Sequence, residues 1–257
     1  MRSDGVLVRS TAAPLPRCAT IDGAHLVVVS PHLDDGVLSC GQLLAARRSA
    51  FVVTVMAGVP AECQPPSEWD RRSGFGSAPT AIRARRYEDA VALSSLDAGW
   101  MWLEYLDAQY NWGRPTVIEL ADALDGAVPQ EAELLGPLGL REDDHQLTGA
   151  AFEEVAQRRL RRGQRCAVYA DEPYHRLDRG ASARARLREL REHGLRATRR
   201  RSVGSDPRRS GRFSWPTTTR DQAMWRSAGR ARPTGGGART APARLLARRR
   251  GSSRRRR

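Results

Sequence analysis

The feature that most constrains the fold is an alternation of short β-branched runs with helical patterns. Residues 25–30 and 51–56 are apolar runs that are too short for a typical helix, and such runs are typical of buried strands. Between them, residues 36–48 carry apolar side chains at helical spacing. A strand, a helix and a second strand in this order predict a parallel pair joined by a right-handed crossover.

The alternation continues along the chain as far as residue 193. Strands are predicted at 100–103, 132–135 and 166–170, and helices at 80–96, 115–124, 145–160 and 183–193. We expect Thr80 to cap its helix, Pro115 to begin the next and Gly194 to stop the last. Residues 58–79 are rich in Pro, Gly and Ser and are predicted to form a long loop. The predicted fold class is α/β, with a mostly parallel sheet covered by helices on both faces.

Positive charge is concentrated at the C-terminal end of the sequence. Residues 199–257 hold 19 Arg and two acidic residues, whereas residues 1–198 hold 24 Arg and 27 acidic residues. The C-terminal segment has one Val and two Leu as its branched aliphatic residues, too few to bury a core. We therefore predict a domain over residues 1–198, with about the first 20 residues flexible, followed by a disordered Arg-rich tail over 199–257. A genuine basic tail and a frameshifted reading of a GC-rich gene both account for this composition.

Several classes of protein are excluded by composition. No apolar run approaches the length of about 18 residues that a membrane span needs, so we expect no membrane partner. Residues 1–20 lack the apolar core of a secretory signal. The four Cys residues form no Cys-x-x-Cys pair, which argues against a disulfide framework or a cysteine zinc site. We expect a protein of the reducing cytoplasm.

Acidic and histidine side chains follow two of the predicted strands. His32, Asp34 and Asp35 come directly after the first strand, and His145 ends an acidic run after the strand at 132–135. The carboxyl ends of parallel strands meet at one edge of a sheet, where ligands bind. His32, Asp35 and His145 would then form a His₂Asp zinc site with an open position for water. Asp34 would be the general base that takes the proton of this water and returns it to a leaving amine.

The same residues have simpler interpretations. Asp35 stands before Gly36 at the start of a predicted helix, where it would also serve as an N-cap. The acidic residues 142–144 would also suit a solvated loop or the first turn of a helix, where the helix dipole attracts negative charge. The residue types and their spacing leave both interpretations open.

The string SPHLDDGVLSCG at residues 30–41 resembles the first motif of the PIG-L/LmbE-like zinc-dependent de-N-acetylases, whose signature is Pro-His-x-Asp-Asp. The resemblance covers roughly residues 24–178. Further matches follow in the same order at residues 53–60, 85–90, 102–107, 137–140, 144–145 and 171–174.

This resemblance implies a Rossmann-like α/β fold and a hydrolase for a linear amide C–N bond. The enzyme would use Zn²⁺ to remove an N-acetyl group from an N-acetylglucosamine-type or related small molecule. The implied zinc ligands are His32, Asp35 and His145, and the implied base is Asp34. Arg85 and Asp107 fall where the family contacts its substrate.

The chain departs from the family pattern at Glu142, which stands where the family has a His that stabilises the oxyanion. An ionised carboxylate cannot donate the required hydrogen bond. Zinc alone, His175 or an impaired enzyme are the open explanations. A second hypothesis is a non-catalytic protein whose Arg-rich tail binds nucleic acid or another polyanion by counterion release. We expect no nucleic-acid partner beyond such non-specific binding.

Overall fold

The computed structural model describes residues 20–110, 113–172 and 174–195. The structural statements below concern these ranges. The predictions of a flexible start over residues 1–19, a domain boundary at 198 and an Arg-rich tail over 199–257 concern residues outside them.

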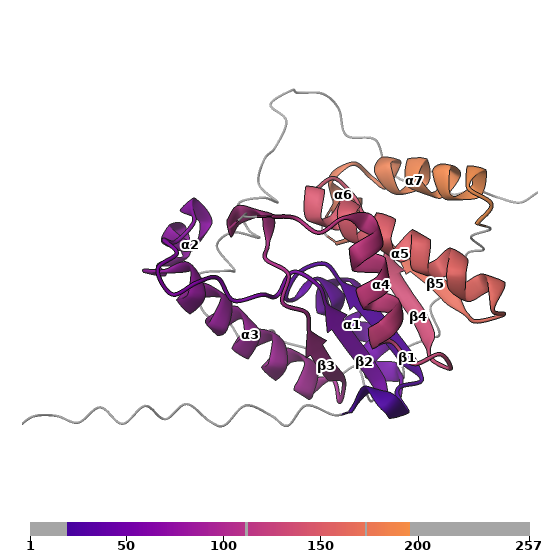
Figure 1. The fold of residues 1–257 in the computed structure, drawn as a ribbon, viewed down its shortest axis with the longest axis horizontal. Helices are drawn as coiled ribbons and strands as arrows, with labels where there is room; N and C mark the ends of the chain where they lie inside the picture. Colours follow the sequence, from indigo (N-terminus) through magenta and orange to yellow (C-terminus); the bar gives the residue numbers. More distant parts are fainter. Residues whose placement is uncertain (1–19, 111–112, 173, 196–257) are drawn as a thin grey trace, which may run out of the picture. The chain divides into compact units, whose positions relative to one another are not determined.

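The centre of the described fold is a five-stranded sheet in the order β3-β2-β1-β4-β5 (Figure 1). All four neighbouring pairs are parallel, which confirms the predicted parallel sheet. On one side of β1 lie β2 and then β3, and on its other side lie β4 and then β5. The order therefore reverses between β1 and β4, where ligands bind in open α/β sheets. The strands are β1 Leu26–Ser30, β2 Ala50–Thr54, β3 Gly99–Trp102, β4 Glu133–Pro137 and β5 Cys166–Tyr169.

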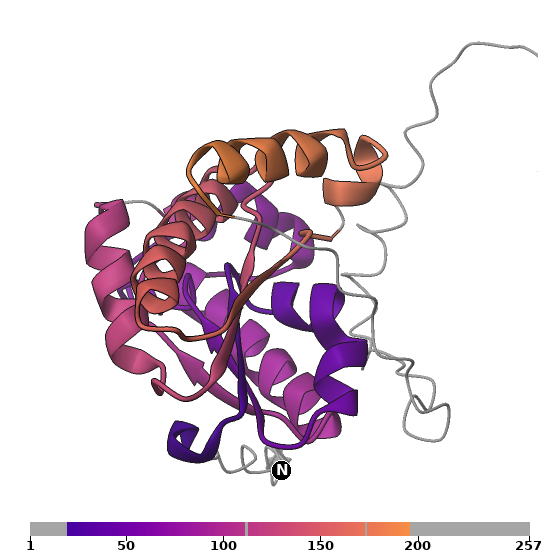
Figure 2. The ribbon, with the colours of Figure 1, turned by 90° about the vertical axis from the view of Figure 1, so that its right-hand side faces the viewer.

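Helices cover both faces of the sheet, as the alternation predicted (Figures 1 and 2). On one face, α1 (Asp35–Ala46) and α3 (Ala78–Ser95) pack with alternate strand residues such as Val28 and Val52. On the other face, α4 (Val117–Ala127) and α5 (Asp143–Arg161) pack against the other set of alternate strand residues, such as Val27 and Val53. Because both faces are buried, the strands read as continuous apolar runs.

The remaining described elements are short or peripheral. A helix, α7 (Ala181–Glu192), packs through Ala183 and Leu190 on Leu138 and Leu140 beyond β4. Gly194 lies beyond its end with φ +85°, in agreement with the predicted stop. The others are the 3₁₀ turns η1 (Ile21–Gly23) and η2 (Ala108–Tyr110) and the short helices α2 (Glu68–Ser73) and α6 (Tyr174–Leu177). Among the described helices, none has both the length and the apolar character needed to span a membrane.

The prediction of a long loop over residues 58–79 was wrong in part, because α2 lies within it. Ser67 and Asp70 form a reciprocal capping box, in which each side chain accepts a hydrogen bond from the other residue's N–H. The capping box satisfies two N–H groups at the helix start, so this polar sequence supports a helix of one and a half turns.

Two predicted helix starts were displaced because a hydroxyl side chain lies just before each helix. The N-cap of α3 is Ser77, whose oxygen accepts a hydrogen bond from the N–H of Thr80, so Thr80 lies in the first turn and is not the cap. The N-cap of α4 is Thr116, which forms a capping box with Glu119, and Pro115 precedes the helix. Short hydroxyl side chains accept from the free N–H groups of the first turn, and this interaction sets the helix start.

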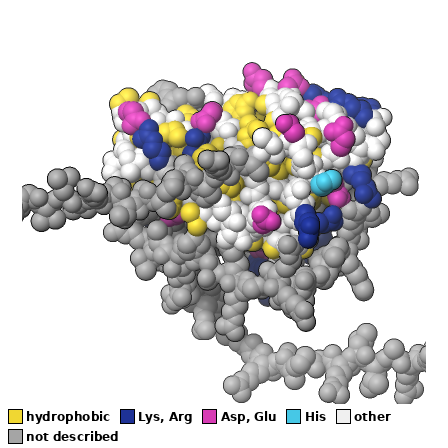
Figure 3. All heavy atoms as spheres, turned by 90° about the horizontal axis from the view of Figure 1, so that it is seen from below, with side chains coloured by type: hydrophobic (Ala, Val, Ile, Leu, Met, Phe, Trp, Pro, Cys, Tyr) yellow, Lys and Arg dark blue, Asp and Glu magenta, His cyan; other side chains and the backbone are white. Residues whose placement is uncertain are grey.

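One face of the described fold is drawn with its side chains coloured by type in Figure 3. On the face shown in Figure 3, acidic and basic side chains are interspersed with apolar and neutral ones. The described part of this face therefore does not offer a field of one sign to a polyanion.

Candidate metal site

The turn between β1 and α1 is held from both sides by Ser30. Its hydroxyl donates to the carbonyl of His32 at 2.6 Å and accepts from the N–H of Gly36 at 2.8 Å. A Cβ at position 36 would lie 3.2 Å from the Ser30 side chain, so a glycine suits this close approach. Asp34, within the turn, has φ +83°, in the left-handed region that non-glycine residues rarely adopt.

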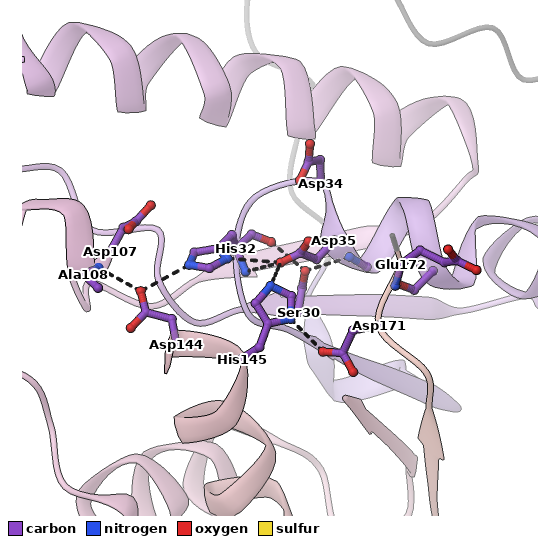
Figure 4. Close-up of polar contacts among 12 residues, drawn as sticks. Ser30, His32, Asp34, Asp35, Asp107, Ala108, Asp144, His145, Asp171 and Glu172 are labelled. Carbon is purple, nitrogen blue, oxygen red and sulfur yellow. Dashed lines mark hydrogen bonds and ion pairs between the residues drawn. The ribbon is translucent and has the colours of Figure 1, made fainter. Parts of the chain in front are cut away.

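Three side chains predicted as metal ligands lie together at the carboxyl ends of β1 and β4 (Figure 4). The Oδ2 atom of Asp35 lies 3.2 Å from Nδ1 of His32 and 3.1 Å from Nε2 of His145. The ligand atoms of the three residues lie within 4.8 Å of one another. Two imidazoles and a carboxylate that converge in this way can hold a zinc-type ion.

The far nitrogen of each imidazole meets a buried carboxylate. Nδ1 of His145 lies 2.6 Å from Oδ1 of Asp171, and Nε2 of His32 lies 3.2 Å from Oδ2 of Asp144. The two acids are only 1% and 2% exposed. A carboxylate on the far nitrogen keeps the proton there and leaves the near nitrogen free to bind a metal. The donor set therefore fits a metal in its orientation as well as in its composition.

Sequence reasoning assigned no role to Asp171 or Asp144. Asp171 follows β5 directly, so the rule that found His32 and Asp35 after β1 would also have found it. Its second oxygen accepts a hydrogen bond from the N–H of Gly139 at 3.1 Å. The signal for Asp144 was its place beside His145, but neither its burial nor its partner could be read from the sequence.

The electrostatics of this group favour a cation. Burial alone would lower the pKa of His145, but hydrogen bonds to Asp171 and Asp35 outweigh it and raise the pKa to about 9. The pKa of His32 also lies well above 6.5, because hydrogen bonds to Asp144 and Asp35 outweigh its burial. The pKa of Asp35 is depressed, since its contacts with the two imidazoles outweigh the effect of burial. Without a metal, protons on the two imidazoles offset part of the negative charge of the three acids.

Asp107 lies at the edge of the same group. Ligand atoms of His32, Asp107 and Asp144 lie within 4.8 Å of one another. Asp144 also accepts hydrogen bonds from the N–H of Ala108 at 2.7 Å and from Arg114 at 2.5 Å. The segment that follows β3 thus borders the candidate site.

Asp34 lies beside the ligand residues without joining them. In Figure 4 its carboxylate points away from His32, Asp35 and His145. Its side chain is part-exposed, and its backbone N–H donates to Oδ1 of Asp89 at 3.2 Å.

The structure rejects the simpler interpretation of Asp35 as a helix cap. Asp34 occupies the N-cap position of α1, and Asp35 is the first helical residue. The Asp35 carboxylate accepts from the N–H of His32, which precedes the helix, at 3.0 Å. The acidic residues Asp143 and Asp144 do lie in the first turn of α5, as the alternative interpretation expected, but Asp144 is buried against His32.

Arg85 lies in a separate buried cluster. Its guanidinium donates to Oδ1 of Asp70 at 2.7 Å and to the hydroxyl of Tyr110 at 3.0 Å. Tyr110 also donates to Asp70, which is fully buried. The cluster joins α2, α3 and η2, and η2 begins with Ala108, whose N–H bonds to Asp144. Arg85 therefore supports the border of the site, and direct substrate contact by Arg85 stays a prediction.

Glu142, the position that departs from the family motif, lies close enough to the phenol of Tyr174 to affect its pKa. Glu142 is exposed and occupies the N-cap position of α5 without a side-chain capping bond. Tyr174 was not singled out from the sequence; its ring packs edge-on against His145, with centroids 4.9 Å apart. His175 is half-buried, and its Nδ1 lies 3.5 Å from Oε1 of Glu172.

No protein-family model matches the sequence, and no curated protein matches it. Among solved structures, a triple mutant of a deacetylase from the teicoplanin biosynthetic pathway is 28% identical, with a TM-score of 0.50, over 59% of this chain and 65% of that chain. The A40926 pseudoaglycone deacetylase is 30% identical, with a TM-score of 0.48, over 60% of this chain and 66% of that chain. The chain thus spans just under two thirds of each of these proteins.

Proposed function

We propose that the chain is a metal-dependent hydrolase that removes an N-acetyl group from a small molecule, as its resemblance to the PIG-L/LmbE-like zinc-dependent de-N-acetylases implies. The substrate class that we propose is an amino sugar of the N-acetylglucosamine type or a related compound. The similar structure from the teicoplanin pathway is a deacetylase, which supports this reaction. Polyanion binding by the Arg-rich segment, the other hypothesis, concerns residues outside the described ranges and gains no support from this site.

One observation carries the proposal. The near nitrogens of two imidazoles lie 3.1–3.2 Å from one carboxylate oxygen of Asp35, while a buried acid holds each far nitrogen. His32, Asp35 and His145 would hold the zinc ion. A bound zinc ion would lower the pKa of its water and polarise the acetamido carbonyl.

The protein's own side chains would orient the reactants and move the proton. Asp34 would accept the proton of the attacking water on its carboxylate and then donate it to the nitrogen of the departing amine. Asp171 and Asp144 would keep the imidazoles in the tautomer that presents a free nitrogen. Asp107, beside His32, is a proposed contact for a substrate hydroxyl, and Arg85 is a proposed contact on the resemblance alone.

The test is release of acetate from N-acetylglucosamine-type substrates by the zinc-loaded protein. Asp34→Asn should keep its zinc and lose activity by roughly 10²-fold or more, since an amide cannot accept the proton of water. Asp35→Ala should lose zinc itself. Asp143→Asn is the matched control, because Asp143 is an exposed acid in the first turn of α5. Full activity in Asp34→Asn would remove it from the mechanism, and a wild-type protein that binds no zinc would reject the proposal.

A further inference from the structure

A buried acid that the proposed mechanism does not use lies beneath the turn that carries Asp34. Asp89 belongs to α3 and is 2% exposed. Its Oδ1 accepts the backbone N–H of Asp34 at 3.2 Å, and its Oδ2 accepts the indole N–H of Trp102 at 2.9 Å. Asp89 thus links α3 and β3 to the turn after β1.

The turn needs such support because its backbone is strained. Asp34 has φ +83°, and a non-glycine residue stays in this unfavourable region only when its surroundings hold it there. Asp34 is also the N-cap residue of α1, but its side chain makes no capping hydrogen bond. The bond from its N–H to a carboxylate is of the charge-assisted kind, which is roughly twice as strong as a bond between neutral groups.

We propose that Asp89 is a positioning residue for Asp34: it holds the backbone N–H of Asp34 and so fixes the turn from which the Asp34 side chain would rotate toward the attacking water. This inference rests on the proposed function, in which Asp34 is the general base. Asp89 does not touch the substrate, because it is buried and both of its oxygens accept hydrogen bonds within the protein.

The chemistry of the Asp89 contacts explains why a carboxylate is needed there. Both partners are N–H donors, so the residue at position 89 must accept twice and donate to neither. A carboxylate satisfies this requirement with its two oxygens. An asparagine has one acceptor oxygen, and its NH₂ group would face one of the two donors. Trp102 has little freedom to turn away, because the guanidinium of Arg86 stacks on its ring at 5.0 Å.

The first experiment compares two neighbouring acid-to-amide changes in the zinc-loaded protein. Asp89→Asn should lower kcat by about 10- to 100-fold, the range found for residues that orient catalytic groups. Its KM and zinc content should stay unchanged, because the ligands and Asp107 are untouched. Glu88→Gln is the control: Glu88 is the preceding residue of α3 and is only half-buried, whereas Asp89 is buried, so kcat should remain at the wild-type value. An unchanged kcat in Asp89→Asn, or a loss that follows a loss of zinc, would overturn the proposal.

The second experiment asks whether Asp89 acts through Asp34. In the Asp34→Asn background the base is already absent, so Asp89→Asn should cause no further loss of kcat. If the two losses multiply instead, Asp89 acts by another route and the inference fails.

The third experiment does not depend on activity. Hydrogen exchange at the Asp34 amide, measured by NMR on the zinc-loaded protein, should be faster in Asp89→Asn than in wild type and unchanged in Glu88→Gln. If wild-type protein hydrolyses no acetamido sugar, the proposed function fails, while faster exchange still supports the hold on Asp34. Unchanged exchange would overturn that hold, whatever the activity.

Discussion

At the scale of single residues, Glu142 is a position where the sequence departs from the motif that it otherwise resembles. Its side chain is exposed and does not cap α5, so a substitution there removes no capping hydrogen bond. Burial and then the charge of Glu142 raise the pKa of Tyr174, and the ring of Tyr174 packs against His145. A negative charge thus lies near the site, where it opposes an oxyanion.

We predict that Glu142→His raises kcat for acetamido hydrolysis. A hydrogen-bond donor to an oxyanion is worth about 3 kcal/mol, or roughly a hundredfold in rate. The gain here should be smaller, because no neighbouring group orients the new ring. Steady-state kinetics of Glu142→His and Glu142→Gln separate donation by the ring from removal of the charge. A kcat at or below the wild-type value in Glu142→His would mean that zinc or another group already fills the role.

The burial of Asp89 also predicts that the stability of the protein depends on pH. Burial raises its pKa from 3.8 to about 6, although hydrogen bonds from Trp102 and Asp34 oppose the shift. Between these pH values the folded state holds a proton that the unfolded state has released, so stability falls as pH rises. Relative to Asp89→Asn, the free energy of unfolding of wild type should fall by up to about 3 kcal/mol from pH 4 to pH 6. Urea unfolding across this range measures it, and parallel profiles for the two proteins would contradict the prediction.

At the scale of elements, the position of α5 depends on a close crossing of two glycines. Gly139 follows β4 with φ +78°, and a Cβ at Gly149 would lie 2.8 Å from the Cα of Gly139. These are backbone atoms, which cannot move aside as a flexible side chain can. The crossing therefore sets how closely α5, and with it His145 one turn earlier, approaches the sheet.

Gly149→Ala should destabilise the protein by about 1–3 kcal/mol, the usual cost of overpacking, and should weaken zinc binding as well. Gly126→Ala is the matched control: it also lies in a helix, but a Cβ there would meet no atom within 4 Å. That control should gain up to about 1 kcal/mol, because Ala favours the helix over Gly. Thermal unfolding and zinc titration of both variants measure the difference. Equal stability of the two variants would show that α5 can shift without cost.

At the scale of the whole described fold, the candidate site ties together segments that are distant in sequence. His32 and Asp35 come from the turn after β1, His145 from α5, and its partner Asp171 from the segment after β5. A metal bound there interacts with the folded chain only, so it should stabilise folding by mass action.

Zinc at 100 times its Kd should add about 2.7 kcal/mol to the free energy of unfolding. For a domain of this size the Tm should rise by roughly 5–10 °C. Differential scanning calorimetry with zinc and with a chelator measures the shift. Asp35→Ala should lose it, and Asp143→Asn should retain it. An identical Tm in zinc and in chelator would argue against a metal held by these three residues.

Local sequence patterns predicted which strands and helices exist better than they predicted the residues at which these elements begin and end. The strands and most helices follow from apolar periodicity, which is a property of neighbouring residues. The helix α2 and the starts of α3 and α4 depend on whether a particular hydroxyl or carboxylate accepts from an N–H, as at Ser67, Ser77 and Thr116. Several residues in each segment could serve as the cap, so the pattern alone did not choose among them.

By itself, the sequence determined the order of the strands and the longer helices, the parallel character of the sheet and the chemical types placed after β1 and β4. These follow from periodicity and from the rule that parallel strands share one carboxyl edge. Only the tertiary structure decided that Asp144 and Asp171 contact the imidazoles. It also decided that Asp70 accepts a hydrogen bond from Arg85 and that Asp89 accepts one from the N–H of Asp34. Those contacts join residues 112, 26, 15 and 55 positions apart. Contacts between residues so distant depend on how the helices pack on the sheet, which no local pattern encodes.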